Sequence, residues 1–230
     1  MVWNKGFTKY THPSVLSISK TMKKKKIDNF RKWREKMKGL GKIPRDYSSL
    51  EKNGNLAEYI GVVLGDGNIS KFPRAERIII SANANNNGFV ERYAKLTASI
   101  FNKEPTVSKI NGANCIRISL YQKNISKRLK IPTGNRSNFE FKVPNWIFHN
   151  KTNILRFLRG LFEAEGSLSI HKATYTYNFS FSNKNKSLLS AVEQELRLLG
   201  FFPEMRTTSV RLRRKQEVEK FKEMIRFREY

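Results

Sequence analysis

A ten-residue pattern occurs twice in this chain, as EYIGVVLGDG at 58–67 and as FLRGLFEAEG at 157–166, and it limits the folds that the chain can adopt. A shift of 99 residues superimposes the small and acidic positions of the two copies: Gly61 on Gly160, Gly65 on Ala164, Asp66 on Glu165 and Gly67 on Gly166. Internal repeats of a fixed period indicate structural units that share one local fold. The sequence therefore predicts two related halves.

The segments after the two copies follow the same order of expected elements. The first half predicts strands over 68–70 and 77–83, a helix over 87–102, strands over 106–110 and 115–121, and a helix over 122–130. The second half predicts strands over 167–170 and 177–183, a helix over 184–199, strands over 204–207 and 210–214, and a helix over 215–228. With the repeated pattern itself as a helix, each half is αββαββα and the fold class is α+β.

Alternation along the strands predicts one buried and one open face for each sheet. The apolar positions form the buried face: Ile116, Ile118 and Leu120 in the first half, and Val210 and Leu212 in the second. Polar and basic positions alternate with them: Arg117 and Ser119, then Arg211 and Arg213. We expect each half to be a four-stranded antiparallel sheet with helices on one face and a basic face left open.

Composition divides the chain into four segments: a basic N-terminal extension over 1–54, a first half over 55–130, a linker over 131–152 and a second half over 153–230. The extension predicts a helix over 14–38, with Ile27, Phe30, Trp33 and Met37 on one stripe. Two interpretations stay open for it. It is either a solvated cationic extension that packs its stripe on the body, or an arm that adds phosphate contacts to a bound duplex.

The net charge and the cysteine content limit which binding partners and metal sites the protein can have. Forty-five Lys and Arg residues against 19 Asp and Glu residues give a formal charge of +26, which points to a polyanionic partner such as nucleic acid. Cys115 is the only cysteine, so a site with several thiolates is excluded, and the three histidines are far apart, so a histidine and cysteine cluster is not expected. Any metal is therefore expected to be held by carboxylates. No segment predicts a membrane span or a signal peptide, so no membrane partner is expected.

The repeated pattern carries the chemistry. Small residues four apart, as in Gly61 and Gly65, lie on one helix face and let two helix backbones approach closely. We expect the two helices to pack on each other about a pseudo-twofold axis, which places Asp66 and Glu165 side by side at their C-termini. Carboxylates are unfavourable at that end of a helix. A divalent cation bound by both acids would explain this arrangement. We expect the backbone carbonyls of Gly65 and Ala164 to bind the same cation.

The two patterns resemble the LAGLIDADG signature of homing endonucleases, in the single-chain form with two motifs. The resemblance covers about residues 55–230, and the last acid of the family pattern falls on Asp66 and Glu165. Glu165 departs from the usual aspartate but keeps the charge. The upstream acid of the pattern falls on Leu64 and Glu163, and the resemblance implies that this position is not an essential ligand.

The resemblance implies a monomer whose two sheets form a saddle on double-stranded DNA. It also implies Mg²⁺-dependent hydrolysis of both strands, with Mn²⁺ or Ca²⁺ able to substitute for binding, inside a cell, in the cytoplasm or in an organelle that carries the host intron. Asn83 and Asn183 are expected to orient water, and Lys123 and Lys215 to stabilise charge at phosphorus. The alternative for these four residues is that the asparagines form turns and the lysines are solvated.

The outward side chains of the sheets are the expected readers of DNA bases: Ser70, Arg77, Ser81, Arg117 and Ser119 in the first half, and Ser169, His171, Asn178, Ser180, Arg206, Arg211 and Arg213 in the second. An RNA maturase and a catalytically silent DNA-binding protein on the same fold remain alternatives, because a fold does not fix a function. Retention of both acids favours the nuclease.

Overall fold

The computed structural model describes residues 4–25, 27, 30–42, 47–136 and 138–230. It divides into two compact units, Met1–Ser48 and Ser49–Tyr230. Among the described residues, no helix is long and apolar enough to cross a membrane.

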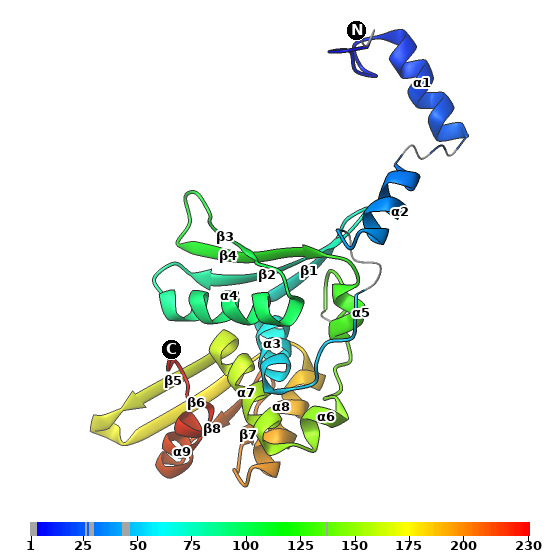
Figure 1. Ribbon diagram of the computed structural model, residues 1–230. Coiled ribbons are helices and arrows are strands. Elements are labelled where there is room, and N and C mark those ends of the chain that lie inside the picture. The colour runs from blue at the N-terminus through cyan, green and yellow to red at the C-terminus, as the bar shows by residue number, and fades with distance from the viewer. Residues whose placement is uncertain (1–3, 26, 28–29, 43–46, 137) are drawn as a thin grey trace. The chain divides into compact units, whose positions relative to one another are not determined.

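The described residues of the N-terminal unit form two helices, α1 (Pro13–Lys24) and α2 (Arg31–Gly39), where the sequence predicts a single helix over 14–38 (Figure 1). That prediction is wrong at residues 25, 27 and 30, which are not helical. The last turn of α1 carries Lys23 and Lys24, and cations there stabilise a helix end through the helix dipole. Lys26, the fourth residue of the lysine run, lies outside the described residues.

The second unit contains two four-stranded antiparallel sheets. Sheet A has the order β1-β2-β4-β3 and consists of β1 (Gly67–Lys71), β2 (Glu76–Asn83), β3 (Thr106–Lys109) and β4 (Cys115–Gln122). Sheet B has the order β5-β6-β8-β7 and consists of β5 (Gly166–His171), β6 (Thr176–Ser182), β7 (Glu204–Met205) and β8 (Ser209–Leu212). The matching strand orders confirm the α+β class and the two related halves.

The helices of the second unit follow the repeat. The first half has α3 (Gly54–Gly65), α4 (Asn87–Phe101) and α5 (Ile125–Leu129), and the second has α7 (Lys151–Glu165), α8 (Lys186–Leu198) and α9 (Lys215–Ile225). A short helix, α6 (Asn145–Phe148), lies in the segment between the halves, and a 3₁₀ turn, η1 (Lys172–Thr174), joins β5 to β6. Four helices begin at an asparagine whose side chain accepts a backbone N–H: Asn53, Asn86, Asn150 and Asn185.

The first half ends in a shorter helix than the sequence predicts. Gln122 completes β4, and Asn124 and Lys130 both take left-handed backbone conformations on either side of α5. The predicted helix over 122–130 is therefore reduced to 125–129. A residue with positive φ cannot continue a right-handed helix, so these two positions set its limits.

The core of each half lies between its sheet and its helices. In sheet A, Ile78 pairs with Leu120 and Ile80 with Ile118, and all four side chains are buried on the face that α4 covers (Figure 1). In sheet B the corresponding buried pairs are Phe179 with Leu212 and Phe181 with Val210. Since neighbouring residues of a strand alternate between faces, the polar residues between these positions lie on open faces.

The two halves meet at α3 and α7, whose backbones are in direct contact. A Cβ atom on Gly61 would lie 2.3 Å from the carbonyl oxygen of Phe157, and one on Gly160 would lie 2.0 Å from that of Glu58. Side chains cannot occupy such positions, so glycine is required at both. The close packing brings the C-terminal ends of the two helices together.

Candidate functional site

The two acids of the repeat lie next to each other where α3 and α7 end. Asp66 directly follows α3 and its N–H donates to the carbonyl of Val62 at 3.0 Å, while Glu165 is the last residue of α7. A Cβ atom on Gly65 would lie 2.5 Å from the Cβ of Ala164 and 3.1 Å from the Cγ of Glu165. The structure therefore brings together the carboxylates and the two small residues whose carbonyls the sequence analysis assigned to a metal.

The surroundings of the acids disfavour their charged forms. Burial raises the pKa of Asp66 to about 7, with a further contribution from the charge of Glu165, and burial also raises the pKa of Glu165. In the described part of the chain, neither acid forms an ion pair with a basic side chain. Two neighbouring carboxylates of this kind lack a compensating positive charge, and a bound cation would supply it.

The donor set fits one class of metal. The described residues contain no group of three or more His, Cys, Asp or Glu side chains that could enclose an ion. A metal at this site would have two carboxylates and would take its other ligands from backbone carbonyls, water or a substrate phosphate. Mg²⁺ commonly binds in this manner, because it keeps several waters and uses only one or two carboxylates.

Arg136 fixes the end of α3 and is a residue that the sequence analysis missed. Its guanidinium donates to the carbonyl of Val63 at 2.7 Å and also to that of Gly67. These carbonyls lie on either side of Asp66, so Arg136 holds the backbone from which that acid projects. The arginine comes from the segment between the halves, where sequence pattern predicts only a linker. Its contact with α3 depends on how that segment folds back.

The two asparagines expected to orient water hold turns instead. The Oδ1 of Asn83 accepts the N–H of Asn85 at 2.9 Å, and the Oδ1 of Asn183 accepts the N–H of Asn185 at 2.9 Å. Asn183 also lines a cavity of about 270 Å³ together with Gly65, the residue before Asp66. The structural alternative accounts for both side chains, and their catalytic role stays a prediction.

Neither lysine expected at the phosphate contacts the acids in the described structure. Lys123 is exposed in the turn between β4 and α5. The Nζ of Lys215 lies 5.9 Å from the centre of the Tyr177 ring, and Tyr177 shares the covered side of sheet B with Phe179. Lys215 is thus associated with the helix-covered face, and a role at phosphorus stays a prediction for both lysines.

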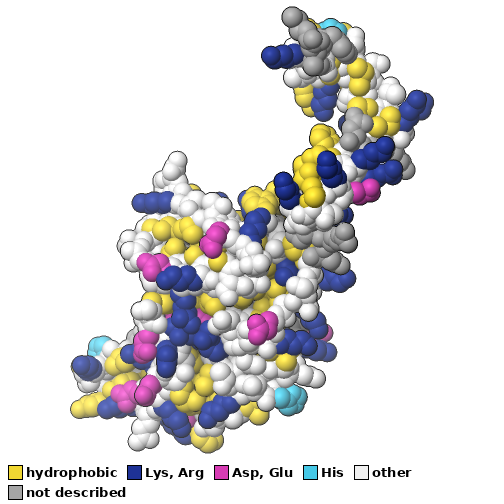
Figure 2. All heavy atoms as spheres, viewed as in Figure 1, with side chains coloured by type: hydrophobic (Ala, Val, Ile, Leu, Met, Phe, Trp, Pro, Cys, Tyr) yellow, Lys and Arg dark blue, Asp and Glu magenta, His cyan; other side chains and the backbone are white. Residues whose placement is uncertain are grey.

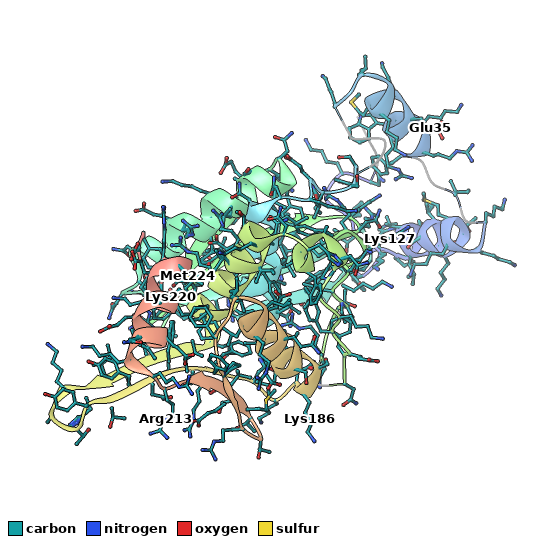
Figure 3. All side chains as sticks on the ribbon, turned by 90° about the horizontal axis from the view of Figure 1, so that it is seen from below. Glu35, Lys127, Lys186, Arg213, Lys220 and Met224 are labelled. Atoms are coloured by element: carbon teal, nitrogen blue, oxygen red, sulfur yellow. The ribbon has the colours of Figure 1, made fainter. Side chains whose placement is uncertain are left out.

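The expected DNA-reading residues occupy the open faces of the two sheets. Register places cross-strand neighbours on one face: Ser70 with Arg77, Ser81 with Arg117 and Thr106 with Ser119 in sheet A, and Ser169 with Asn178, His171 with Thr176 and Ser180 with Arg211 in sheet B. Arg206 lies in the turn after β7, and Arg213 directly follows β8. Figure 3 shows Arg213 on one side of the strands, and Lys220 and Met224 of α9 on the other.

Among the charged side chains on the visible surface of the protein, basic ones prevail over acidic ones. Figure 2 shows Lys and Arg side chains over both sheets and helices, with fewer Asp and Glu among them. On sheet A, Arg77 is held by two aromatic rings, since its guanidinium lies 5.2 Å from the ring centre of Phe72 and donates to the hydroxyl of Tyr121 at 3.3 Å. Such contacts hold the guanidinium in a fixed direction.

A buried ionic cluster lies beside the α3–α7 contact and was not predicted. Glu58 of α3 is fully buried, and its carboxylate accepts from Arg92 Nη2 of α4 at 2.8 Å and pairs with Arg156 Nε of α7 at 2.6 Å. Arg159 of α7 lies 3.8 Å from the same carboxylate. The cluster therefore joins elements from both halves with charge-assisted contacts.

The upstream acid of the second pattern belongs to this cluster and not to the metal site. The carboxylate of Glu163 accepts the N–H of Arg228 at 2.6 Å and the hydroxyl of Tyr230. Burial raises its pKa, and the hydrogen bonds oppose that effect. The corresponding Leu64 is buried in the core. Glu163 therefore ties the last residues of this chain to α7.

Comparisons with known proteins agree with this arrangement. Residues 152–226, which contain the second copy of the pattern, match the family model described as a LAGLIDADG-like domain. The structure superimposes on that of I-DmoI in complex with DNA and Mn with a TM-score of 0.55 and 20% identity, over 76% of this chain and 97% of the other. The second half of the chain therefore matches the LAGLIDADG-like domain family, and the chain shares its fold with I-DmoI.

Two further proteins resemble this chain, one in its structure and one in its sequence. The N-terminal LAGLIDADG domain of DUF199/WhiA superimposes with a TM-score of 0.52 and 16% identity, over 79% of this chain and 86% of the other. A curated protein, the replication factor C small subunit of Methanocaldococcus jannaschii, is 32% identical over 164 residues. That match covers 66% of this chain but only 9% of the relative. The chain thus corresponds to a small part of that protein's length.

Proposed function

We propose that the protein is a site-specific DNA endonuclease of the homing type, which makes a double-strand break by divalent-metal-dependent hydrolysis of phosphodiester bonds. The observation that carries this proposal is the juxtaposition of Asp66 and Glu165 at the ends of α3 and α7, between two sheets with open polar faces. One acid comes from each half, so each half supplies one carboxylate for one DNA strand. A monomer with internal pseudo-symmetry suffices for such a reaction.

In this proposal, one set of residues binds the metal ion and another set binds the DNA. Asp66 and Glu165, with the carbonyls of Gly65 and Ala164, would hold Mg²⁺, which would supply a water of lowered pKa and charge stabilisation at phosphorus. Arg136 keeps the Asp66 backbone in place through the carbonyls of Val63 and Gly67. The open faces of the sheets bind the duplex on both sides of the acids, and their side chains select the sequence.

The relatives with known structures support the proposal. The structures that superimpose on this chain include I-DmoI with DNA in the presence of Mn, Ca or Mg. The net charge of +26 gives the electrostatic attraction that DNA binding needs. Residues 23–25 and the rest of the basic N-terminal unit would add phosphate contacts that carry no sequence information.

The decisive experiment uses the full chain and a library of randomised duplex DNA. The protein is incubated with the library in Mg²⁺ or in EDTA, and the ends of the products are sequenced. We expect double-strand breaks at one family of related sequences in Mg²⁺ and none in EDTA. Sequence-specific binding without breaks would indicate the silent DNA-binding alternative. Preferential binding of structured RNA over duplex DNA would indicate the maturase.

A further inference from the structure

One acidic side chain lies within the basic open face of sheet B. Glu204 of β7 pairs directly with Arg211 of β8 in the antiparallel register. Arg211 alternates with Val210 and Leu212, both fully buried, so its side chain lies on the open face. Directly opposed residues of antiparallel strands share a face, and Glu204 therefore lies there too.

Glu204 holds one edge of the Arg211 guanidinium. Its Oε2 atom accepts from Arg211 Nε at 3.0 Å and lies 2.9 Å from Arg211 Nη2. The nearby Arg206 donates from Nη2 to the same oxygen at 3.4 Å. The hydrogen bond from Arg211, with the charges of Arg211, Arg213 and Arg206, keeps the pKa of Glu204 below its ordinary value. The carboxylate is therefore ionised at neutral pH.

The contact with Glu204 leaves the Nη1 and Nη2 edge of the Arg211 guanidinium free to donate hydrogen bonds. A guanidinium carries five N–H groups in a planar fork. Glu204 engages the Nε side, so the Nη1 protons and the outer Nη2 proton point away from it. One outward proton on Nη1 and the outer proton on Nη2 form an edge that can donate to O6 and N7 of a guanine in the major groove. The arginine is thus held in a direction that suits a base before DNA arrives.

We propose that Glu204 is a positioning residue that sets the base preference of the second half through Arg211. The proposal rests on the DNA-binding function proposed above. A free arginine on a sheet face has many rotamers and can turn to the phosphate backbone, which is the same for every sequence. Glu204 restricts those rotamers and also repels phosphate. It therefore lowers affinity for all DNA while raising discrimination at one base pair.

An arginine on the open face of the first half is held by other contacts. The loss of Glu204 should therefore change base preference in the second half only. Arg77 is fixed on the open face of sheet A by Phe72 and Tyr121, with no acid among its described contacts. Loss of Glu204 should therefore leave the preference of the first half unchanged. The two halves of the target then respond differently to a single substitution.

The test measures base preference and non-specific affinity together. Wild-type protein and the Glu204→Gln, Glu204→Asp and Arg211→Ala variants are profiled for binding against a randomised duplex library in EDTA. Glu193→Gln is the matched control, because Glu193 also pairs with an arginine, Arg197, at 2.9 Å and lies on α8, away from the open face. Affinity for a scrambled duplex is measured at several salt concentrations.

We expect Glu204→Gln to reduce discrimination at one base pair of one half-site by about 3- to 10-fold and to raise affinity for the scrambled duplex. Arg211→Ala should relax the same base pair but lower affinity for the scrambled duplex. Glu204→Asp should retain part of the preference, and Glu193→Gln all of it. Combining Glu204→Gln with Arg211→Ala should relax that base pair no further than Arg211→Ala alone.

Three results would overturn the proposed role of Glu204. An unchanged preference in Glu204→Gln, measured beside a wild-type protein that does select a sequence, would overturn the role of Glu204 and leave the proposed function standing. Lower affinity for every duplex in Glu204→Gln would also overturn it, since it would indicate a structural role for β7. A wild-type protein that selects no sequence would overturn the proposed function, and this inference with it.

Discussion

A Cβ atom on Gly61 would lie 3.1 Å from the Cα atom of Gly160, so the two repeated helices touch backbone to backbone. This contact joins the halves and sets the positions of Asp66 and Glu165 at the helix ends. Any side chain larger than hydrogen at either glycine must push α3 and α7 apart. The distance between the two carboxylates therefore depends on residues that carry no functional group.

The Gly160→Leu variant should be strongly destabilised. Its Cβ atom would lie 2.0 Å from the carbonyl oxygen of Glu58, and a backbone atom cannot move aside as a flexible side chain does. We expect a loss of about 3 kcal/mol or more in the free energy of unfolding, measured by urea denaturation. Gly39→Leu is the control, because nothing lies within 4 Å of its Cβ position. Equal stability of the two variants would contradict the close packing.

The Asp66→Asn and Glu165→Gln variants should bind the target but fail to cut it. Each loses a carboxylate that would hold the metal, and neither position reads a base. We expect cleavage to fall by about 100-fold or more, since metal ions supply several kcal/mol of transition-state stabilisation. Binding should stay equal or become tighter, because a negative charge near phosphate is removed. Cleavage at the wild-type rate by the double variant would exclude these acids as metal ligands.

The Glu58→Gln variant should destabilise the joined halves. It removes the buried acceptor that Arg92 and Arg156 share. Breaking a buried ion pair costs about 3–5 kcal/mol, and partial exposure of the two arginines favours the lower end of that range. Glu91→Gln, an exposed change on α4 opposite Lys95, should alter stability by less than about 0.5 kcal/mol. Similar unfolding curves for the two variants would mean that the cluster contributes little.

The stability of the protein should fall as pH rises from about 4.5 to 7, in part because of Glu195. This side chain is fully buried on α8, and burial raises its pKa to about 7. Between the unfolded and folded pKa values the folded protein keeps a proton that the unfolded chain has lost. The full penalty is present above pH 7. Glu195→Gln should therefore flatten this slope and unfold at higher urea concentration than the wild type at pH 8.

The control for Glu195 lies on the same helix. Glu193 is paired with Arg197 near the surface, so Glu193→Gln should leave the pH dependence of unfolding unchanged. At pH 5 the advantage of Glu195→Gln should vanish, because the wild-type carboxyl is then protonated in the folded state. An equal stabilisation by Glu195→Gln at pH 5 and pH 8 would indicate a packing effect without titration.

The Arg77→Ala variant should lose base preference in the half-site that sheet A reads. Aromatic contacts with Phe72 and Tyr121 fix this arginine on the open face. We expect a loss of about 1–3 kcal/mol in discrimination at one position, measured by target profiling. Replacing Lys23–Lys26 with serine should instead weaken binding to every sequence alike and reduce the salt dependence. A uniform loss of affinity in Arg77→Ala would make this residue a phosphate contact.

The repeated architecture can be predicted from the amino-acid sequence, because local patterns encode it. Strand alternation around Ile118 and Val210 fixes which face of each sheet is buried, and small residues at Gly61 and Gly160 require a close helix contact. These patterns depend on neighbours within a few positions of the chain. The meeting of Asp66 and Glu165 follows from them once the two helices pack in parallel.

The partners that surround these residues follow from the tertiary structure and not from the local sequence. Arg136 reaches the carbonyls of Val63 and Gly67 across a separation of about 70 positions, and Glu58 gathers arginines from both halves. Glu204 and Arg211 are only seven residues apart, yet their contact requires the register of β7 against β8. Such contacts depend on how segments fold back and pair, and no local period in a sequence encodes them.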